Sequence, residues 1–211
     1  MADRTKPPVQ RDLFREYRDE YRATGKPALV KIGTARYLEA AGSGAPGGPA
    51  FGAAIGSLYQ LVYALKFRHK ARGRDFKVAA LECFWDRPPF SGKVGKKELA
   101  KLPWRLAVRV PEFVTRPEVK ALGSRRTPKR GAAPSPVTLQ SIREGDCIQM
   151  LHVGPYSKET ATVQQLAKAA RAEGLAFAGS LHEIYLSDPR RVPATRLRTI
   201  VRIGVRKVRS S

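Results

Sequence analysis

The sequence predicts an α+β fold in which one order of elements, strand, helix, strand, strand, occurs twice. Two strand-like stretches resemble each other, because Leu81–Asp86 and His182–Pro189 each carry a glutamate among aromatic side chains. A segment with helical periodicity precedes each stretch, and an extended segment rich in β-forming residues precedes each of these helices. The repetition indicates an internal duplication of the chain.

The chain is long enough for one domain built from two lobes. It has 211 residues, of which 42% are hydrophobic, so it can bury a core of its own. We predict a polar or helical arm over residues 1–27 and a single domain over residues 28–208. The predicted parts of this domain are a first lobe at 28–115, a basic connector at 116–136 and a second lobe at 137–208.

The elements of the first lobe follow from its residue pattern. Runs of β-forming residues predict strands at 28–40, 76–85 and 104–110. Apolar residues at helical spacing predict a helix from Phe51 that ends at Arg72-Gly73. The connector has room for a short helix at 117–122.

The second lobe repeats this order. Extended structure is expected at 137–153, a turn follows it, and a helix then begins with Ser157 as its expected N-cap and ends at Gly174. The strand with Glu183 comes next, and residues 197–208 form the last predicted strand.

The glycine-rich stretch 42–49 allows two interpretations. Backbone amides at the start of a helix attract anions, so the stretch could hold a phosphate. It lacks the Lys-Ser/Thr pair of a phosphate-binding loop and the acidic residue of a dinucleotide site. A connector is therefore the favoured interpretation.

The formal net charge of +22 would favour a polyanionic partner. The basic residues are spread along the chain, with local density at 68–77, 93–101 and 120–130. No recognition helix or RNA-binding aromatic signature accompanies them, which favours a solvated surface over a dedicated nucleic-acid site. Weak, nonspecific and salt-sensitive binding of nucleic acid remains expected.

The remaining composition predicts a soluble, cytoplasmic protein without metal or other cofactor. The two cysteines, Cys83 and Cys147, fall within predicted strands, as buried thiols of a reducing compartment do. His69, His152 and His182 show no ligand spacing, so structural roles are favoured over metal or haem binding. The chain begins without a signal-peptide pattern and holds no apolar run that could span a membrane.

The candidate site residues come from the two repeated strands. Alternation places Glu183 and Tyr185 on one face of their strand, where Glu183 is either a solvated surface group or part of a lined pocket. In the first copy, Glu82 and Phe84 share a face. If a pseudo-twofold axis relates the lobes, Glu82 and Glu183 face one cleft, and two carboxylates there imply chemistry.

Four stretches carry a resemblance to a known family over residues 28–208. These are Glu144–Tyr156 and His182–Pro189 in the second lobe, and Leu81–Trp85 and Trp104–Thr115 in the first. They resemble the GyrI-like small-molecule-binding family, in particular its stand-alone branch, and are similar to the drug-binding domain of multidrug-responsive regulators. Several long motifs in the same order make the resemblance specific.

The resemblance implies two lobes that form an antiparallel sheet with two helices and a central ligand cleft. Acidic and aromatic side chains of this cleft would receive amphipathic, often cationic, compounds, with Glu183 as the cleft glutamate. Some stand-alone members hydrolyse the cyclopropane ring of DNA-alkylating natural products, which is a detoxification activity. The sequence departs from the family at Asp86, where a second aromatic is expected after Trp85. Strict alternation also places Trp85 opposite Glu82, in the core unless a bulge returns it.

These observations predict a site in which Glu183 activates water while protonated Glu82 or Tyr185 stabilises the oxygen that gains charge. Phe84, Trp85, Tyr156 and Tyr185 would contact the ligand, although Tyr156 could equally pack its own turn. Two alternatives stay open. The protein is a non-catalytic binder in which Glu183 is the counter-charge of a cation, or it is a basic module that interacts with nucleic acid or a nucleic-acid enzyme.

Overall fold

Six strands form a closed antiparallel barrel in the order β1-β3-β2-β5-β6-β4. The computed structural model describes residues 10–86, 101–124 and 136–208. The expected basic density at 93–101 lies almost wholly outside these residues, as do the chain start and positions 125–135 of the connector. The strands are β1 (Ala28–Ser43), β2 (Leu81–Trp85), β3 (Pro103–Val110), β4 (Thr138–Val153), β5 (Leu175–Tyr185) and β6 (Arg198–Lys207).

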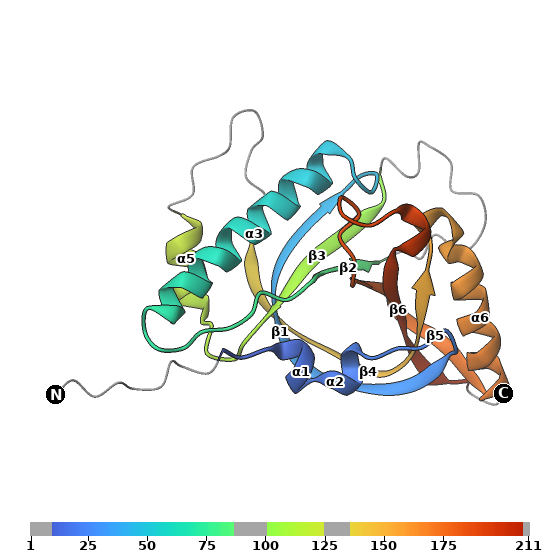
Figure 1. Cartoon of the computed structure of the whole chain (residues 1–211). Helices are drawn as coiled ribbons and strands as arrows, with labels where there is room; N and C mark the ends of the chain where they lie inside the picture. Colours follow the sequence, from blue (N-terminus) through green and yellow to red (C-terminus); the bar gives the residue numbers. More distant parts are fainter. Residues whose placement is uncertain (1–9, 87–100, 125–135, 209–211) are drawn as a thin grey trace.

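Five α-helices occur among the described residues, together with two short 3₁₀ turns. The α-helices are α1 (Leu13–Glu16), α2 (Arg18–Tyr21), α3 (Pro49–Lys70), α5 (Arg116–Gly123) and α6 (Glu159–Ala172), and the 3₁₀ turns are η1 (Tyr156–Lys158) and η2 (Ala194–Arg196). In Figure 1, α3 and α6 lie on two different sides of the strands, and α1 and α2 lie below them.

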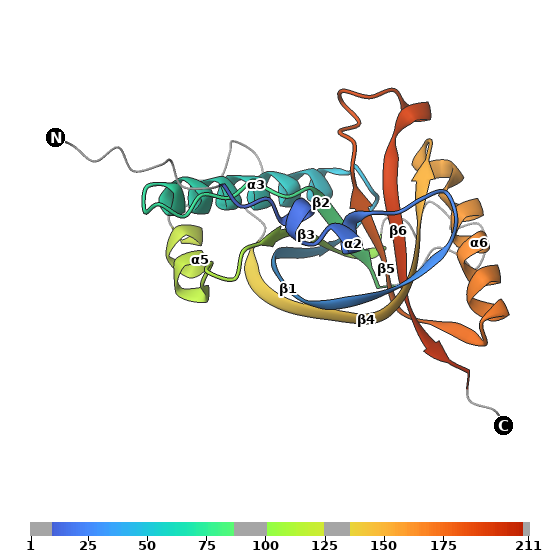
Figure 2. The same ribbon diagram turned by 60° about the horizontal axis from the view of Figure 1, so that its bottom comes forward.

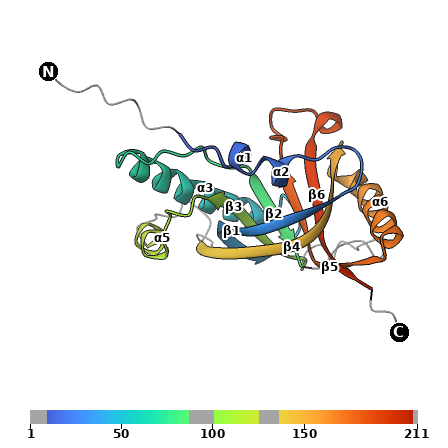
Figure 3. The same cartoon turned by 90° about the horizontal axis from the view of Figure 1, so that it is seen from below.

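Two contacts between the halves of the chain close the barrel. The long strands β1 and β4 run side by side, from Ala28 opposite Gln149 to Glu39 opposite Thr138 (Figure 3). The short strand β2 pairs with β5, from Glu82 opposite Ile184 to Trp85 opposite Leu181. The second contact is the one that positions the candidate site, because both repeated strands take part in it.

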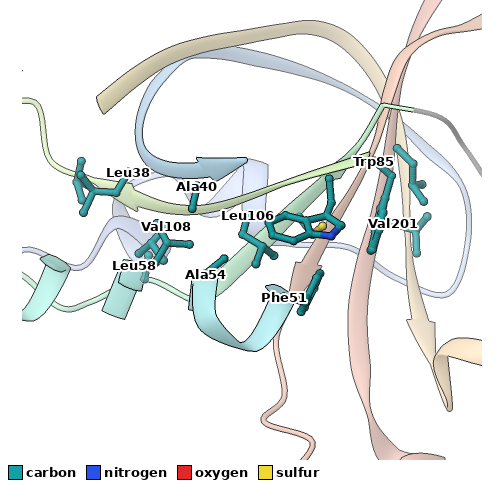
Figure 4. Packing of buried hydrophobic residues seen from close by; sticks show 14 of the residues in the cluster. Leu38, Ala40, Phe51, Ala54, Leu58, Trp85, Leu106, Val108 and Val201 are labelled. Atoms are coloured by element: carbon teal, nitrogen blue, oxygen red, sulfur yellow. The ribbon is translucent and has the colours of Figure 1, made fainter. Parts of the chain in front are cut away.

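The main hydrophobic core lies between the helices and one face of the sheet. The apolar stripe of α3 supplies Phe51, Ala54 and Leu58, which face Leu106 and Val108 of β3 (Figure 4). All five side chains are buried. Burial of a large apolar side chain contributes roughly 1.5–3 kcal/mol, so this layer stabilises the attachment of α3 to the sheet.

A glycine lets β1 approach a tryptophan of β3. Gly42 lies directly opposite Trp104, and a Cβ atom at Gly42 would come within 2.3 Å of the indole ring. Such a contact is sterically forbidden, so the strand needs glycine at this position. The glycine-rich stretch 42–49 thus begins as part of β1, and only its later part connects the strand to α3.

The N-terminal segment lies over the face of the sheet that α3 and α6 leave uncovered (Figure 2). The Asp12 side chain caps α1 by accepting from the Phe14 amide at 3.1 Å. Backbone hydrogen bonds then join the segment to the domain, from Lys77 to Arg11 at 2.7 Å and from Leu151 to Thr24 at 2.7 Å. The arm expected over residues 1–27 is therefore packed on the barrel where the structure describes it.

The structure confirms the α+β class and the antiparallel pairing, and it corrects several details. The sheet closes into a barrel; α5 forms where a short helix at 117–122 was expected, and α1 and α2 form within the arm. The strand expected at 76–85 begins only at Leu81, since Phe76 makes a single bridge to Arg11. Ser157 does not cap α6, because η1 intervenes and Lys158 takes the N-cap position. The duplication of the lobes stays a prediction.

Candidate functional site

The strand β5 presents two chemically different faces. In paired strands, residues opposite each other point to the same side of the sheet. Glu183 lies opposite Cys83, which belongs to the main core, whereas Ile184 lies opposite Glu82. Glu183 therefore projects on the helix-covered face, and Glu82 projects on the other.

A tyrosine of the same strand holds the Glu183 carboxylate. The Tyr185 hydroxyl donates a hydrogen bond to Glu183 Oε2 at 2.6 Å. Glu183 is 8% exposed. Burial, and then the charge of Glu183, raise the pKa of Tyr185 well above its usual value, so the hydroxyl stays protonated and keeps donating.

A second tyrosine approaches from the turn before α6. The Tyr156 ring meets the Tyr185 ring edge to face, with centroids 5.7 Å apart and planes at 81°. Tyr156 is 40% exposed, so it extends the buried pair to the surface. Burial, followed by the charge of Glu183, also raises the pKa of Tyr156. Tyr156 therefore packs against the site as well as in its own turn.

The turn that positions Tyr156 is built by a glycine and a histidine. Gly154 has a φ of 133°, a conformation that favours glycine. The His152 ring nitrogens bond the Thr162 hydroxyl at 2.8 Å and the Pro155 carbonyl at 3.2 Å. Because a carbonyl oxygen only accepts, the proton of the ring lies on Nε2, which donates the hydrogen bond to Pro155. His152 is thus structural, as predicted, and ties the turn to α6.

The partner carboxyl of Glu183 is Glu159, the first residue of α6. Glu159 is 7% exposed. Burial, and then the charge of Glu183 together with a hydrogen bond to it, raise the pKa of Glu159 to about 10. The Glu159 carboxyl is thus held in its protonated form at neutral pH. An acidic residue in the first turn of a helix is favourable in any protein. The sequence therefore contained no sign that Glu159 belongs to the site.

Cys83 and Trp85 of β2 lie on the same face as Glu183. Burial, and then the Glu183 charge, raise the pKa of the Cys83 thiol well above its ordinary value. Trp85 is 4% exposed and stacks on Phe51 with centroids 6.1 Å apart. Trp85 projects from the face of the sheet opposite to Glu82, as alternation predicts, and belongs to the core. Contact between Trp85 and a ligand stays a proposal.

The structure does not bring Glu82 and Glu183 into one cleft. Glu82 is fully buried on the opposite face, where its Oε2 lies 2.9 Å from Nε2 of His182. The Phe84 side chain projects from the same face as Glu82 and stacks on the His182 ring, with the ring centroids 3.9 Å apart. The expected cleft walled by Phe84 and shared by both glutamates is therefore wrong in its geometry. The cause is the register, which displaces the two glutamates by one residue.

A charged network surrounds His182 on this opposite face. His182 Nδ1 lies 3.0 Å from Glu144 Oε2, and Arg202 donates to Glu144 Oε1 at 2.9 Å. Burial alone would lower the pKa of His182, but Glu144 and Glu82 offset it and raise the pKa. Burial would likewise raise the pKa of Glu144, but His182 and Arg202 lower it to about 2. The groups satisfy one another, which is typical of a structural network.

The N-terminal segment completes the network from outside the barrel. The Tyr21 hydroxyl donates to Glu82 Oε1 at 2.9 Å, and Arg109 donates to Glu20 Oε2 at 2.6 Å. Arg202 also donates to the Glu20 carbonyl. Both oxygens of Glu82 therefore have protein partners and need no ligand.

A pocket of about 250 Å³ lies near this segment, away from Glu183. Its lining includes Tyr17, Arg109, Thr34 and Ser141. The Arg109 guanidinium lies 3.8 Å from the centre of the Tyr17 ring, so a cation–π contact already occupies part of the lining.

Two further features concern metals and membranes. Within residues 10–86, 101–124 and 136–208, no group of three or more His, Cys, Asp or Glu side chains is arranged to hold a metal ion. No helix in the described part of the chain is long and apolar enough to cross a bilayer.

Comparison with known proteins agrees with this architecture. The model of the GyrI-like small molecule binding domain matches residues 126–206. An uncharacterized conserved protein from Listeria innocua is 32% identical, with a TM-score of 0.83 over 93% of this chain and 100% of that chain. A hydrolase encoded by lin2189 from Listeria innocua is 31% identical, with a TM-score of 0.82 over 94% and 100% of the two chains.

A more distant likeness concerns the fold alone. The C-terminal domain of EcmrR is 12% identical, with a TM-score of 0.52 over 87% of this chain and 98% of that domain. No curated protein sequence matches the chain.

The barrel and the matched sequence together define a small-molecule-binding domain. The chain belongs to the GyrI-like family.

Proposed function

We propose that the protein binds a small organic molecule at Glu183 and hydrolyses a strained cyclopropane ring within it. The observation that supports this best is the buried Glu183 carboxylate, held at 2.6 Å by Tyr185 and bordered by the half-exposed Tyr156. A carboxylate beside aromatic rings can attract an amphipathic molecule and also accept a proton from water. The 31% identity to a hydrolase from Listeria innocua adds support for turnover.

In the proposed reaction, Glu183 is the general base. The water oxygen forms a bond to a cyclopropane carbon while a water proton passes to Glu183. The ring C–C bond breaks, and its electron pair moves into a carbonyl group conjugated with the ring. Tyr185 keeps the Glu183 carboxylate oriented through its hydrogen bond, so that the base meets the water from a fixed position.

The experiment is incubation with a cyclopropane-bearing alkylating compound, followed by mass spectrometry of the ring-opened product. Wild type should form product, and Glu183→Gln should not, while a thermal melt shows that the variant is folded. Glu173→Gln is the matched control, because Glu173 is exposed at the far end of α6. Unchanged turnover in Glu183→Gln would contradict the assignment.

The non-catalytic alternative uses the same residues. Glu183 would be the counter-charge of an aromatic cation, and Tyr156 and Tyr185 would supply stacking and cation–π attraction. The edge-to-face arrangement of the two rings beside a carboxylate favours this candidate. A stabilising thermal shift with the compound, without any product, would support binding alone.

The net charge of +22 also supports a weak association with nucleic acid. Such an association depends on counterion release, so it should fall steeply as salt increases. Filter binding across a salt series tests it. Affinity that survives at physiological salt would instead indicate a dedicated site.

A further inference from the structure

We propose that Glu159 is the proton donor of this site and shares a single proton with Glu183. This inference rests on the proposed function at Glu183 and adds a catalytic residue to it. The two carboxyl groups come from different elements, since Glu183 lies on β5 and Glu159 begins α6. The packing of α6 on β4 and β5 brings them together.

Burial and mutual repulsion determine the protonation state of the pair. Two carboxylates in contact repel each other, and burial penalises the charged form further. Glu159 is 7% exposed and Glu183 is 8% exposed, so water screens neither group well. One of them therefore keeps its proton at neutral pH. The hydrogen bond from Tyr185 stabilises the ionised form of Glu183, which assigns the proton to Glu159.

One oxygen of Glu159 has no partner. Glu159 Oε1 is buried and has no hydrogen-bond partner among the residues that the structure describes. A buried polar atom without a partner costs free energy, commonly 1–3 kcal/mol by order of magnitude. Such atoms are rare in structural positions and are expected where a ligand supplies the partner. This oxygen is therefore the one available to a substrate.

The surroundings of the pair favour the same assignment. The titratable groups near Glu159 are Glu183 and Tyr185 on β5, Cys83 on β2, His152 on β4, Tyr156 and Lys158 on η1, and Asp188 after β5. The tyrosines and Cys83 have raised pKa values and are neutral. His152 is engaged with Thr162 and Pro155. The tyrosines and Cys83 therefore add no charge to the pair, and Lys158 and Asp188 are charged groups of opposite sign near it.

The shared proton completes the reaction. Water gives a proton to Glu183 as its oxygen bonds to the cyclopropane carbon. The ring C–C bond breaks, and the electron pair reaches the conjugated carbonyl oxygen. That oxygen takes the Glu159 proton, which lies on Oε1 once the substrate carbonyl binds there in place of the hydrogen bond to Glu183. Afterwards Glu183 is protonated and Glu159 is ionised. Transfer of the proton along the hydrogen bond between them restores the starting pair, and the net change is the addition of one water.

A substrate-free measurement tests the proton itself. Infrared spectra at neutral pH should show the C=O stretch of a protonated carboxyl group in the wild-type protein. The band should disappear in Glu159→Gln and persist in Glu173→Gln. A band that remains in Glu159→Gln, or no such band in the wild type, would overturn the proposal whether or not any substrate is turned over.

Kinetics then test the role. General acid catalysis typically contributes about 10²–10⁴-fold, so kcat should fall by that order in Glu159→Gln while KM changes little. The loss of rate at high pH, where the donor is ionised, should also disappear in this variant. Wild-type turnover that Glu159→Gln leaves unchanged would contradict the role. Absence of turnover in the wild type would count against the proposed function, and the infrared band would still decide the shared proton.

Discussion

Glu82 and Glu183 lie on paired strands but project from opposite faces of the sheet, because Glu82 pairs with Ile184 and Glu183 pairs with Cys83. The two glutamates consequently have different environments. Glu82 is surrounded by groups that hydrogen-bond to it, whereas Glu183 faces another carboxyl group. The first arrangement is typical of a structural network, and the second is the one that we propose for the ligand.

This difference predicts opposite effects on stability. Glu82→Gln leaves the buried His182 without one of its two counter-charges, and breaking a buried ion pair costs about 3–5 kcal/mol. Glu183→Gln removes a buried negative charge, and the Gln amide oxygen can still accept the hydrogen bond from Tyr185, so the free energy of unfolding should stay unchanged or increase slightly. Urea denaturation measures both. A larger loss in Glu183→Gln than in Glu82→Gln would contradict the assignment of the two faces.

The pKa of Glu144 predicts a dependence of stability on pH. Its folded value of about 2 lies below its ordinary value of 4.5, so its contribution is present above pH 4.5 and is lost as pH falls toward 2. His182 acts in the other direction. Because its pKa is raised in the fold, its contribution to stability is fully present below the ordinary value of 6.5 and is lost as pH rises above the raised value. The urea midpoint of the wild-type protein should therefore fall steeply as the pH is lowered from 5 to 2.

Glu144→Gln tests the origin of this acid loss. The variant should be less stable at neutral pH, and its urea midpoint should change less between pH 5 and pH 2. Glu112→Gln serves as the control, since the Glu112 side chain is 65% exposed in its pair with Arg11. An acid transition of the same steepness in Glu144→Gln and in wild type would show that another carboxylate is responsible.

The attachment of the N-terminal segment depends on Tyr21. Its hydroxyl donates to Glu82 and accepts from Arg109 at 3.3 Å, both in buried surroundings. Hydrogen bonds to charged groups contribute about 1.5–3 kcal/mol, so Tyr21→Phe should lower the free energy of unfolding by that order. Tyr17→Phe, in the same segment but 37% exposed, should cost little. Equal effects of the two substitutions in urea denaturation would refute this role of Tyr21.

Both thiols should be unreactive in the native protein. Cys83 and Cys147 are buried and free, and burial raises the pKa of Cys147 to about 12 and the pKa of Cys83 well above its ordinary value. Because the thiolate is the nucleophile, iodoacetamide at mildly alkaline pH should label neither residue until urea unfolds the protein. Mass spectrometry counts the labels. Rapid labelling of Cys83 in the native state would mean that the Glu183 face is more open than the burial indicates.

The sequence was sufficient for the parts of the fold that depend on local pattern. Alternation predicted that Glu183 and Tyr185 share a face, and apolar spacing predicted α3, because both patterns are properties of single elements. The barrel closure and the pairing of β2 with β5 depend on long-range register instead. A shift of one residue in the register between two strands moves a side chain to the other face of the sheet. The pattern within either strand therefore could not show whether Glu82 and Glu183 meet.

The missed residue has a similar explanation. Glu159 was visible in the sequence as an acidic residue in the first turn of a helix, where a carboxylate is favourable in any protein. Only the packing of α6 on β5 shows that it meets Glu183. The 3₁₀ turn η1, which replaces the expected Ser157 cap, sets the start of α6 at this position.

Calorimetric titration with an aromatic monocationic dye, compared between wild type and Glu183→Gln, tests the central claim that the Glu183 face is the ligand site. We predict binding by the wild type and by Glu173→Gln, and at least tenfold weaker binding by Glu183→Gln, equivalent to about 1.4 kcal/mol. Equal affinity for all three proteins would contradict it and direct attention to the pocket beside Arg109.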